Sequence, residues 1–299
     1  MKVFKYKNPS YKYESDPLKQ DYFNQTLDSI QPCDCIEGMK RLPDTSVDLI
    51  IADPPYNLSK GNIWKLDNVT NLPGFGGKWT KMMENWDNTS LYDYWNFTFE
   101  WISQAKRLLK QSGSIWVCGT YHNIGLINTI FQIIGIEIIN EIIWYKRNAF
   151  PNLSGRRFTA SHENVLWGHI GRKKRDYFFN YDYLKKIGFK NDSLNTPGKQ
   201  IRTVWDIPNN KRKNEIMFGK HPSQKPLSLI NRMIIASSKI DDTVLIPFAG
   251  SGTECVSAKS LKRHFIGFEK DLKYIQLINR RLEYLDKILK QTTLENVLF

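Results

Sequence analysis

Apolar and polar residues repeat along the chain with the two periods that distinguish strands from helices. Short apolar runs bounded by turn residues predict buried strands at residues 46–53, 114–118, 136–144, 163–168, 243–247 and 264–268. Apolar side chains that recur every three or four residues predict helices at residues 90–110, 123–134, 225–238, 254–261 and 271–290. Strands that alternate with helices form a mostly parallel sheet covered on both faces, so we expect an α/β fold.

Two further segments show neither period. Residues 1–29 are polar and rich in Lys, Tyr and Asn, and they predict an irregular N-terminal arm. Residues 57–88 contain four glycines and three tryptophans, and loops of this length are typically functional or disordered. We therefore expect the second segment to be mobile until it binds a partner.

Composition narrows the class of protein. A chain of 299 residues with 41% hydrophobic content can bury a substantial core. The longest apolar run, residues 133–143, is interrupted by Gly135 and Glu137 and falls short of the roughly 20 residues of a membrane span. The N-terminus lacks the apolar core of a signal peptide, so we expect a cytoplasmic protein without a membrane partner. Four scattered cysteines predict buried thiols, and the Cys33–Cys35 spacing suits no zinc site, so no metal is expected.

Positive charge is concentrated in one part of the chain. The formal net charge is +13, and residues 171–225 hold +9 of it, with 14 Lys or Arg against 5 Asp or Glu. Aromatic residues are interleaved with these bases, at Tyr177, Phe178, Phe179, Tyr181, Tyr183, Phe189, Trp205 and Phe218. Because basic side chains bind phosphates and aromatic rings can contact bases, the segment is expected to bind nucleic acid. The alternative is a solvated basic region whose aromatic side chains pack inward.

A glycine-rich turn follows the strand predicted at residues 243–247. Gly250 and Gly252 let the backbone approach a ligand closely, and the start of the next helix offers unpaired N–H groups. Glu269 stands 17 residues beyond Gly252, at the end of the next strand, where its carboxylate can accept hydrogen bonds from two ribose hydroxyls. The turn and the acid predict the adenosine half of a nucleotide-cofactor site, although the third glycine of the dinucleotide motif is absent.

The tetrapeptide Asp53-Pro54-Pro55-Tyr56 ends the strand predicted at residues 46–53. Its prolines hold the backbone extended and leave carbonyl oxygens without competing N–H donors nearby. An aromatic amine is a weak nucleophile because its lone pair is delocalised into the ring. If the Asp53 carboxylate and the Pro54 carbonyl each accept an amine N–H, the nitrogen can attack a methyl group, while Tyr56 stacks on a base that has left the duplex. The alternative is that the tetrapeptide only connects a strand to a turn and that Asp53 has a structural role.

Taken together, these motifs resemble the β group of DNA amino-methyltransferases that use S-adenosyl-methionine, in which the amine motif precedes the cofactor motif. The resemblance spans roughly residues 30–285 and is carried by the segments 34–39, 48–59, 86–87, 219–226, 247–253 and 265–269. Residues 121–124 and 151–159 are similar to the DpnA type, which modifies adenine in GATC and also accepts single strands.

The resemblance implies a Rossmann-like methyltransferase fold with a seven-stranded, mostly parallel sheet, a permuted motif order and a target-recognition insertion. It divides the chain into an arm (1–29), a catalytic domain (30–170 and 222–299) and a target-recognition region (171–221). The catalytic residues would be Asp53, Pro54, Pro55 and Tyr56. The cofactor would contact Asp34, Cys35, Asp53, Lys225, Phe248, Ala249, Gly250, Ser251, Gly252, Thr253 and Glu269. DNA would contact Arg156, Arg157, Arg172, Lys173, Lys174, Arg175, Lys211, Arg212 and Lys213.

The activity implied is transfer of a methyl group from S-adenosyl-methionine to N6 of a flipped-out adenine in double-stranded DNA, within a restriction-modification system. Single-stranded DNA, a cognate restriction endonuclease and a second copy of the chain are expected partners. Methylation of cytosine N4 is the alternative within the family. One departure favours a third reading, a catalytically silent DNA-binding relative: Ile246 stands two residues before Phe248, where the family usually has Asp. The absence of that Asp carboxylate should weaken contact with the methionine end of the cofactor unless another group substitutes.

Overall fold

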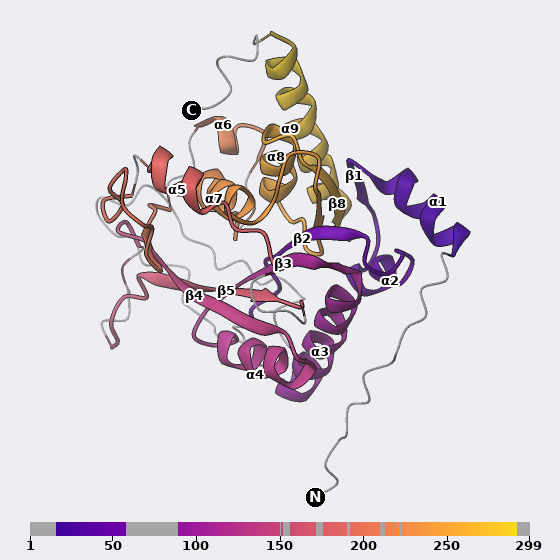
Figure 1. Ribbon diagram of the computed structural model, residues 1–299, viewed down its shortest axis with the longest axis horizontal. Coiled ribbons are helices and arrows are strands. Elements are labelled where there is room, and N and C mark those ends of the chain that lie inside the picture. The colour runs from indigo at the N-terminus through magenta and orange to yellow at the C-terminus, as the bar shows by residue number, and fades with distance from the viewer. Residues whose placement is uncertain are drawn as a thin grey trace, which may run out of the picture.

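The computed structural model describes residues 16–57, 89–149, 151, 156–171, 176–189, 192–209, 213–219, 221 and 223–291. Across these residues, eight strands form one sheet flanked by nine helices (Figure 1). The strands are β1 (Ser29–Gln31), β2 (Val47–Ala52), β3 (Leu109–Gly119), β4 (Glu137–Tyr145), β5 (His162–His169), β6 (Val204–Asp206), β7 (Thr243–Ile246) and β8 (His264–Phe268). The helices are α1 (Pro17–Thr26), α2 (Cys35–Lys40), α3 (Leu91–Leu108), α4 (Ile124–Ile134), α5 (Tyr181–Ile187), α6 (Lys213–Ile216), α7 (Leu227–Ser237), α8 (Thr253–Ser260) and α9 (Leu272–Gln291).

The sheet has the order β1-β8-β7-β2-β3-β5-β4-β6. Its strands are parallel except β5, which runs antiparallel to both neighbours, β3 and β4. The α/β class and the mostly parallel sheet expected from the sequence are therefore confirmed. The order places β2 beside β7, so the tetrapeptide and the glycine-rich turn, far apart in the sequence, follow adjacent parallel strands.

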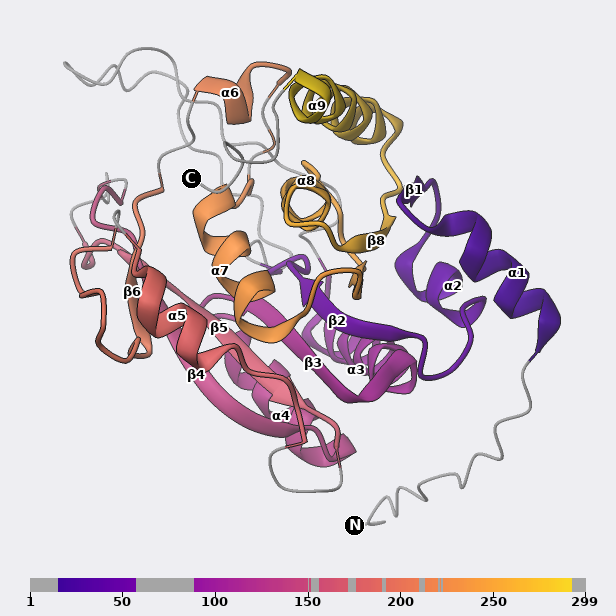
Figure 2. The ribbon, with the colours of Figure 1, turned by 45° about the horizontal axis from the view of Figure 1, so that its top comes forward.

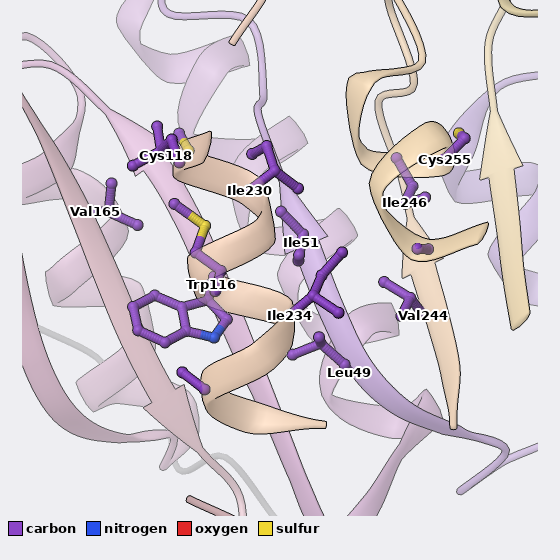
Figure 3. Close-up of a cluster of buried hydrophobic side chains, with 14 of the residues drawn as sticks. Leu49, Ile51, Trp116, Cys118, Val165, Ile230, Ile234, Val244, Ile246 and Cys255 are labelled. Carbon is purple, nitrogen blue, oxygen red and sulfur yellow. The ribbon is translucent and has the colours of Figure 1, made fainter. Parts of the chain in front are cut away.

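Two hydrophobic cores lie on opposite faces of the sheet. Successive side chains of a strand point to opposite faces, and β2 shows the division: Leu49 and Ile51 belong to one core, Ile50 and Ala52 to the other. The helices α7, α8 and α9 cover the first face, whereas α3 and α4 cover the second (Figure 2). The first core includes Ile246 at the end of β7 (Figure 3). Both faces are buried, as a parallel sheet requires.

Local sequence signals set the helix ends. The Asp34 carboxylate accepts from the backbone N–H of Ile36 and so caps α2, and the hydroxyl of Ser90 caps α3 in the same way. Gly135 ends α4 with a φ of 75°, a left-handed conformation that favours glycine. Among the helices that the structure describes, none combines the length and apolar character needed to cross a membrane.

Three expectations need correction. The arm is not wholly irregular, because Asp16 caps α1 and Pro17 occupies its first turn. The sheet has eight strands rather than seven in the described part of the chain. One of them, β6, lies inside the basic segment and pairs with β4, so part of the expected insertion continues the sheet. The expected mobility of residues 57–88 concerns residues that, apart from Asn57, lie outside those described.

Candidate active site

A cavity of about 500 Å³ lies at the carboxyl edge of the sheet. The segments that follow β1, β8, β7 and β2 line it in that spatial order, because these four strands are parallel neighbours. Ligands of open α/β sheets bind at this edge. Eleven of the predicted catalytic and cofactor residues line the cavity: Asp34, Cys35, Asp53, Pro54, Pro55, Lys225, Phe248, Ala249, Gly250, Ser251 and Glu269.

Two predicted cofactor residues, Gly252 and Thr253, shape the glycine-rich turn without lining the cavity. Gly252 precedes α8 with a φ of 73°, and a Cβ atom there would lie 2.7 Å from the side chain of Ile278. Arg281, on α9, donates to the Ser251 carbonyl and to the Thr253 hydroxyl. Side chains of α9 therefore support the turn, and the contact with Ile278 together with the positive φ restricts position 252 to glycine.

Glu269 is fixed in place by backbone donors. Its Oε2 accepts from the N–H of Gly250 at 2.8 Å, and its Oε1 accepts from the N–H groups of Lys270 and Asp271 at 2.8 and 2.9 Å. Burial raises the pKa of Glu269, against these donors. Oε2, which has a single donor, keeps capacity for a further hydrogen bond, as recognition of a ribose hydroxyl would require. The cavity volume and the apolar ring of Phe248 also suit an adenosine group.

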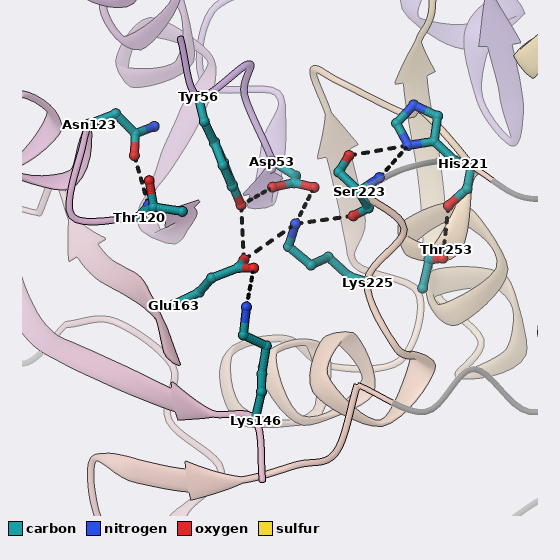
Figure 4. A network of polar contacts seen from close by, with 11 residues as sticks. Asp53, Tyr56, Thr120, Asn123, Lys146, Glu163, His221, Ser223, Lys225 and Thr253 are labelled. Carbon is teal, nitrogen blue, oxygen red and sulfur yellow. Dashed lines mark hydrogen bonds and ion pairs between the residues drawn. The ribbon is translucent and has the colours of Figure 1, made fainter. Parts of the chain in front are cut away.

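At the other end of the cavity, Asp53 is held through both carboxylate oxygens. Tyr56 donates its hydroxyl to Oδ1 at 2.6 Å, and the ammonium of Lys225 contacts Oδ2 at 2.6 Å (Figure 4). The Tyr56 ring is therefore anchored through its hydroxyl beside Asp53, and its stacking on a base stays a prediction.

Sequence reasoning missed the two residues that extend this cluster, Glu163 and Lys146. Glu163 begins the buried part of β5, and its carboxylate accepts from the Tyr56 hydroxyl at 3.2 Å and from Lys146 at 2.9 Å (Figure 4). The Lys225 ammonium lies 3.7 Å from the same carboxylate. The sequence offered one signal, an acid near the start of an apolar strand. It did not show the partners of that acid, because Tyr56, Lys146 and Lys225 come from distant parts of the sequence or from another strand end.

The cluster balances two carboxylates with two ammonium groups. Burial opposes the charge of Lys225, but the carboxylates of Asp53 and Glu163 hold the pKa of Lys225 above its ordinary value. Burial likewise opposes ionisation of Glu163, but Lys225 and Lys146 hold its pKa below the ordinary value. Burial raises the pKa of Asp53, and the Lys225 ammonium and the Tyr56 hydroxyl oppose that rise by favouring the carboxylate form.

The two prolines of the tetrapeptide differ in their use of carbonyl oxygens. The Pro55 carbonyl accepts from the Tyr94 hydroxyl at 2.7 Å, and Asn123 in turn donates to that hydroxyl at 3.1 Å. No described residue donates to the Pro54 carbonyl, although Pro54 lines the cavity. The pair of acceptors predicted for an amine, Asp53 and Pro54, thus lies on one cavity wall, with the neighbouring carbonyl fixed from behind.

Ile246 and Glu254, on either side of the glycine-rich turn, differ in what they offer the cavity. Ile246 is fully buried in the core beneath it and offers nothing polar to the cavity (Figure 3). Glu254, which we did not predict as a site residue, lines the cavity from the first turn of α8 and is only 4% exposed. Burial and, second, the charge of Asp53 raise the pKa of Glu254 to about 7. Among the described residues, no group of three or more His, Cys, Asp or Glu side chains could hold a metal ion.

The predicted DNA-binding residues are only partly described. Arg156, Arg157 and Lys213 have exposed side chains, and Arg157 donates to the Tyr121 hydroxyl at 3.0 Å. The others, Arg172, Lys173, Lys174, Arg175, Lys211 and Arg212, lie outside the described residues. The interleaved aromatic residues divide between the two alternatives. Trp205 packs inward against Trp116, whereas Phe179, Tyr181 and Tyr183 are about 40% exposed.

Comparison with known protein families and sequences gives one consistent result. A family model described as DNA methylase, of the N6/N4 type, matches residues 47–280. The chain is 38% identical over 279 residues to Type II methyltransferase M2.DpnII of Streptococcus pneumoniae, covering 93% of this chain and 97% of the relative. It is also 38% identical over 258 residues to Type II methyltransferase M2.MboI of Moraxella bovis, covering 86% and 88% of the two chains.

Solved structures share the fold. M1.HpyAVI, crystallised as a complex with S-adenosyl-methionine, is 26% identical with a TM-score of 0.58, over 85% of this chain and 98% of that one. The cytosine-N4-specific PvuII DNA methyltransferase is 18% identical with a TM-score of 0.63, over 88% and 91% of the two chains. The similarity to the PvuII enzyme is evidence for a shared fold only.

Proposed function

The chain belongs to the N6/N4-type DNA methylase family, and on that premise we propose that it transfers the methyl group of S-adenosyl-methionine to the N6 amine of an adenine flipped out of DNA. The observation that carries the proposal is the placement of Asp53 and Pro54 beside the cofactor turn, on adjacent strands of one sheet. Type II relatives support a place in a restriction-modification system, acting on cytoplasmic DNA.

In this proposal, the Asp53 carboxylate and the Pro54 carbonyl each accept one N–H of the amine. The two acceptors draw the nitrogen toward a tetrahedral geometry whose lone pair faces the cavity. When bound, S-adenosyl-methionine supplies an electrophilic methyl group on its sulfonium. The methylated nitrogen then carries one proton too many, and Asp53, which held that N–H, is placed to receive it. To accept the amine, Asp53 must exchange or share its contact with the Tyr56 hydroxyl.

The cofactor would be held between the turn and the acid that faces it. Glu269 would accept from the ribose hydroxyls, and Gly250 would bring backbone close to the ligand. Phe248, fixed by edge contact with Trp101 at 5.4 Å between ring centroids, would form an apolar wall. Asp34 would serve indirectly, because its carboxylate caps α2 and contacts the Lys270 ammonium.

The basic segment would track the phosphates of the target. Arg156, Arg157 and Lys213 are exposed and carry this part of the proposal among the described residues. A cognate endonuclease, a homodimer and single-stranded substrates belong to the same proposal, with GATC as the proposed target.

Analysis of methylated nucleosides tests the proposal directly. Purified protein is incubated with labelled cofactor and unmethylated DNA, and the DNA is then digested to nucleosides. We expect N6-methyladenine; N4-methylcytosine would select the alternative activity, and no methylated nucleoside on any DNA would contradict both.

Asp53→Ala should abolish methyl transfer, by at least roughly 100-fold, because it removes an acceptor that acts on the amine. Its DNA affinity should remain near wild type, measured by fluorescence anisotropy under equal salt. Wild-type activity in Asp53→Ala would show that Asp53 has no role in transfer.

A further inference from the structure

Glu254 is a buried carboxylate to which the transfer mechanism gives no role. It is the second residue of α8, directly after the glycine-rich turn, and its side chain lines the cavity at 4% exposure.

Among the described residues, no side chain forms a hydrogen bond or ion pair with the Glu254 carboxylate, which accepts from its own backbone N–H. The cations whose charge reaches it are engaged elsewhere. Lys225 forms ion pairs with Asp53 and Glu163, and Arg281 donates to the backbone and hydroxyl groups of the turn. A buried carboxylate without an ion-pair partner is costly unless a ligand supplies one. Since the neighbouring cluster is already neutral, the missing partner is a cation.

We propose that Glu254 binds the ammonium group at the amino-acid end of S-adenosyl-methionine, an inference that rests on the proposed function. Glu269 and Asp53 follow β8 and β2, which are separated by β7 alone, so the two strands lie about 10 Å apart and both acids line the same cavity. With the ribose at Glu269 and the methyl group facing Asp53, the amino-acid end lies beside Asp53. Asp53 is also the charge that acts most strongly on Glu254.

The core beneath the turn explains why this acid comes from a helix. Ile246 ends β7 as a fully buried member of the hydrophobic core, so no carboxylate reaches the cavity from that strand. Glu254 follows eight residues later, on the helix that the same turn begins, and presents its carboxylate to the same cavity. The chain therefore keeps an acid near the cofactor while its strand end is apolar.

Binding of three probes, measured by calorimetry at pH 7.5, tests the proposal. S-adenosyl-methionine carries both the ammonium and the sulfonium, S-adenosyl-homocysteine keeps only the ammonium, and 5′-methylthioadenosine lacks the amino-acid end. In Glu254→Gln we expect the affinity for the first two to fall roughly 10- to 100-fold, as for a buried charge-assisted hydrogen bond. The affinity for 5′-methylthioadenosine should stay unchanged. Glu283→Gln, exposed on α9, should match wild type for all three.

The other outcomes separate the rival explanations. A loss confined to S-adenosyl-methionine would place the sulfonium against Glu254 and overturn the proposal, as would equal loss for all three probes or no loss for any. If wild-type protein bound none of the probes, the proposed function itself would fail.

A second measurement serves if Glu254→Gln does not fold. In wild type, lowering the pH from 7.5 to 6 protonates Glu254 and should weaken both amino-acid-bearing probes about tenfold relative to 5′-methylthioadenosine. The ratio between probes is the readout, because His221, Lys225 and Asp53 also line the cavity and the charge of Arg281 reaches Glu254, so these groups affect all three probes. An unchanged ratio would contradict the proposal.

Discussion

The two carboxylates nearest to the proposed methyl-transfer point differ in how their charge is balanced. Asp53 contacts the Lys225 ammonium at 2.6 Å, whereas Glu254 has no such partner among the described residues. Burial raises the pKa of both acids, and at Asp53 the Lys225 ammonium in direct contact opposes that rise. The cavity thus contains one acceptor that is ready for the amine and one whose ionisation is coupled to the cofactor.

The raised pKa of Glu254 makes it a source of instability in the cofactor-free protein. Burial raises this pKa to about 7, so the folded protein keeps a proton that the unfolded chain releases above about pH 4.3. The free energy of unfolding therefore falls as the pH rises through this window. We expect Glu254→Gln to gain about 2 kcal/mol relative to wild type between pH 5.5 and pH 8. Guanidinium unfolding at both pH values measures the gain, and a constant difference would show that Glu254 does not titrate there.

Individual residues were predictable where a short motif carried them. Asp53, Pro54 and Glu269 were found from the chemistry of the segments in which they stand, and they line the cavity. Glu163 and Lys146 were missed because their contact joins strands β5 and β4 across the sheet, and no local pattern encodes such a pair.

At the scale of single elements, the turn before α8 depends on two glycines in unequal degree. Both have positive φ, 49° at Gly250 and 73° at Gly252, but the space around them differs. A Cβ on Gly250 would approach His221 at 3.4 Å, an ordinary contact, whereas a Cβ on Gly252 would meet Ile278 at 2.7 Å.

Gly252→Ala should therefore lower the free energy of unfolding by roughly 2–4 kcal/mol, adding a clash to backbone strain. Gly250→Ala, with strain alone, should lose about 1–2 kcal/mol. Urea denaturation of both variants measures the difference. Equal losses would mean that Ile278 on α9 moves aside at little cost and that the clash does not contribute.

Part of the basic segment, the strand β6, belongs to the folded core of the protein. Trp205 on β6 is 4% exposed and packs against Trp116, and the guanidinium of Arg232 lies 4.8 Å from its ring centroid. Trp205→Ala should cost about 3–5 kcal/mol of stability by thermal or chemical unfolding. Tyr183→Ala, at an exposed position of α5, should cost less than about 1 kcal/mol. A small loss in Trp205→Ala would place Trp205 outside the core.

Most elements were predictable, because a long helix or a buried strand repeats its period several times. The helices α3, α4, α7, α8 and α9 begin and end within a few residues of the predicted ranges. The short elements α1 and β6 were missed for the same reason: three to ten residues with mixed polarity show no clear period, and tertiary contacts decide their structure.

For the whole molecule, net charge determines how binding depends on salt. The chain carries +13, and a protein that contacts 6–10 phosphates loses roughly 10³–10⁵ in DNA affinity between 50 and 200 mM salt. We expect a fall of this size for DNA, measured by anisotropy. S-adenosyl-methionine binding should change far less over the same range, because its charged contacts lie inside the cavity. Equal salt dependence of the two ligands would contradict a phosphate-tracking basic surface.

The order of strands could not be read from periodicity. The pattern predicts that strands exist and that both faces are buried, but it does not say that β2 lies between β7 and β3. The family resemblance implied a permuted motif order, and the structure shows the neighbours directly, in the parallel pairing of Leu49 with Val244 and of Ile50 with Leu245.

That pairing has a consequence for protein synthesis. About 190 residues separate Asp53 from the strand β7, so a ribosome working at roughly 5–20 residues per second exposes the amine motif for about 10–40 seconds before its partner strand emerges. During that time β2 lacks one neighbour and the cavity lacks half of its wall. A nascent chain therefore lacks the glycine-rich turn and Glu269, and with them the cofactor side of the cavity, until the β7–β8 region has been translated.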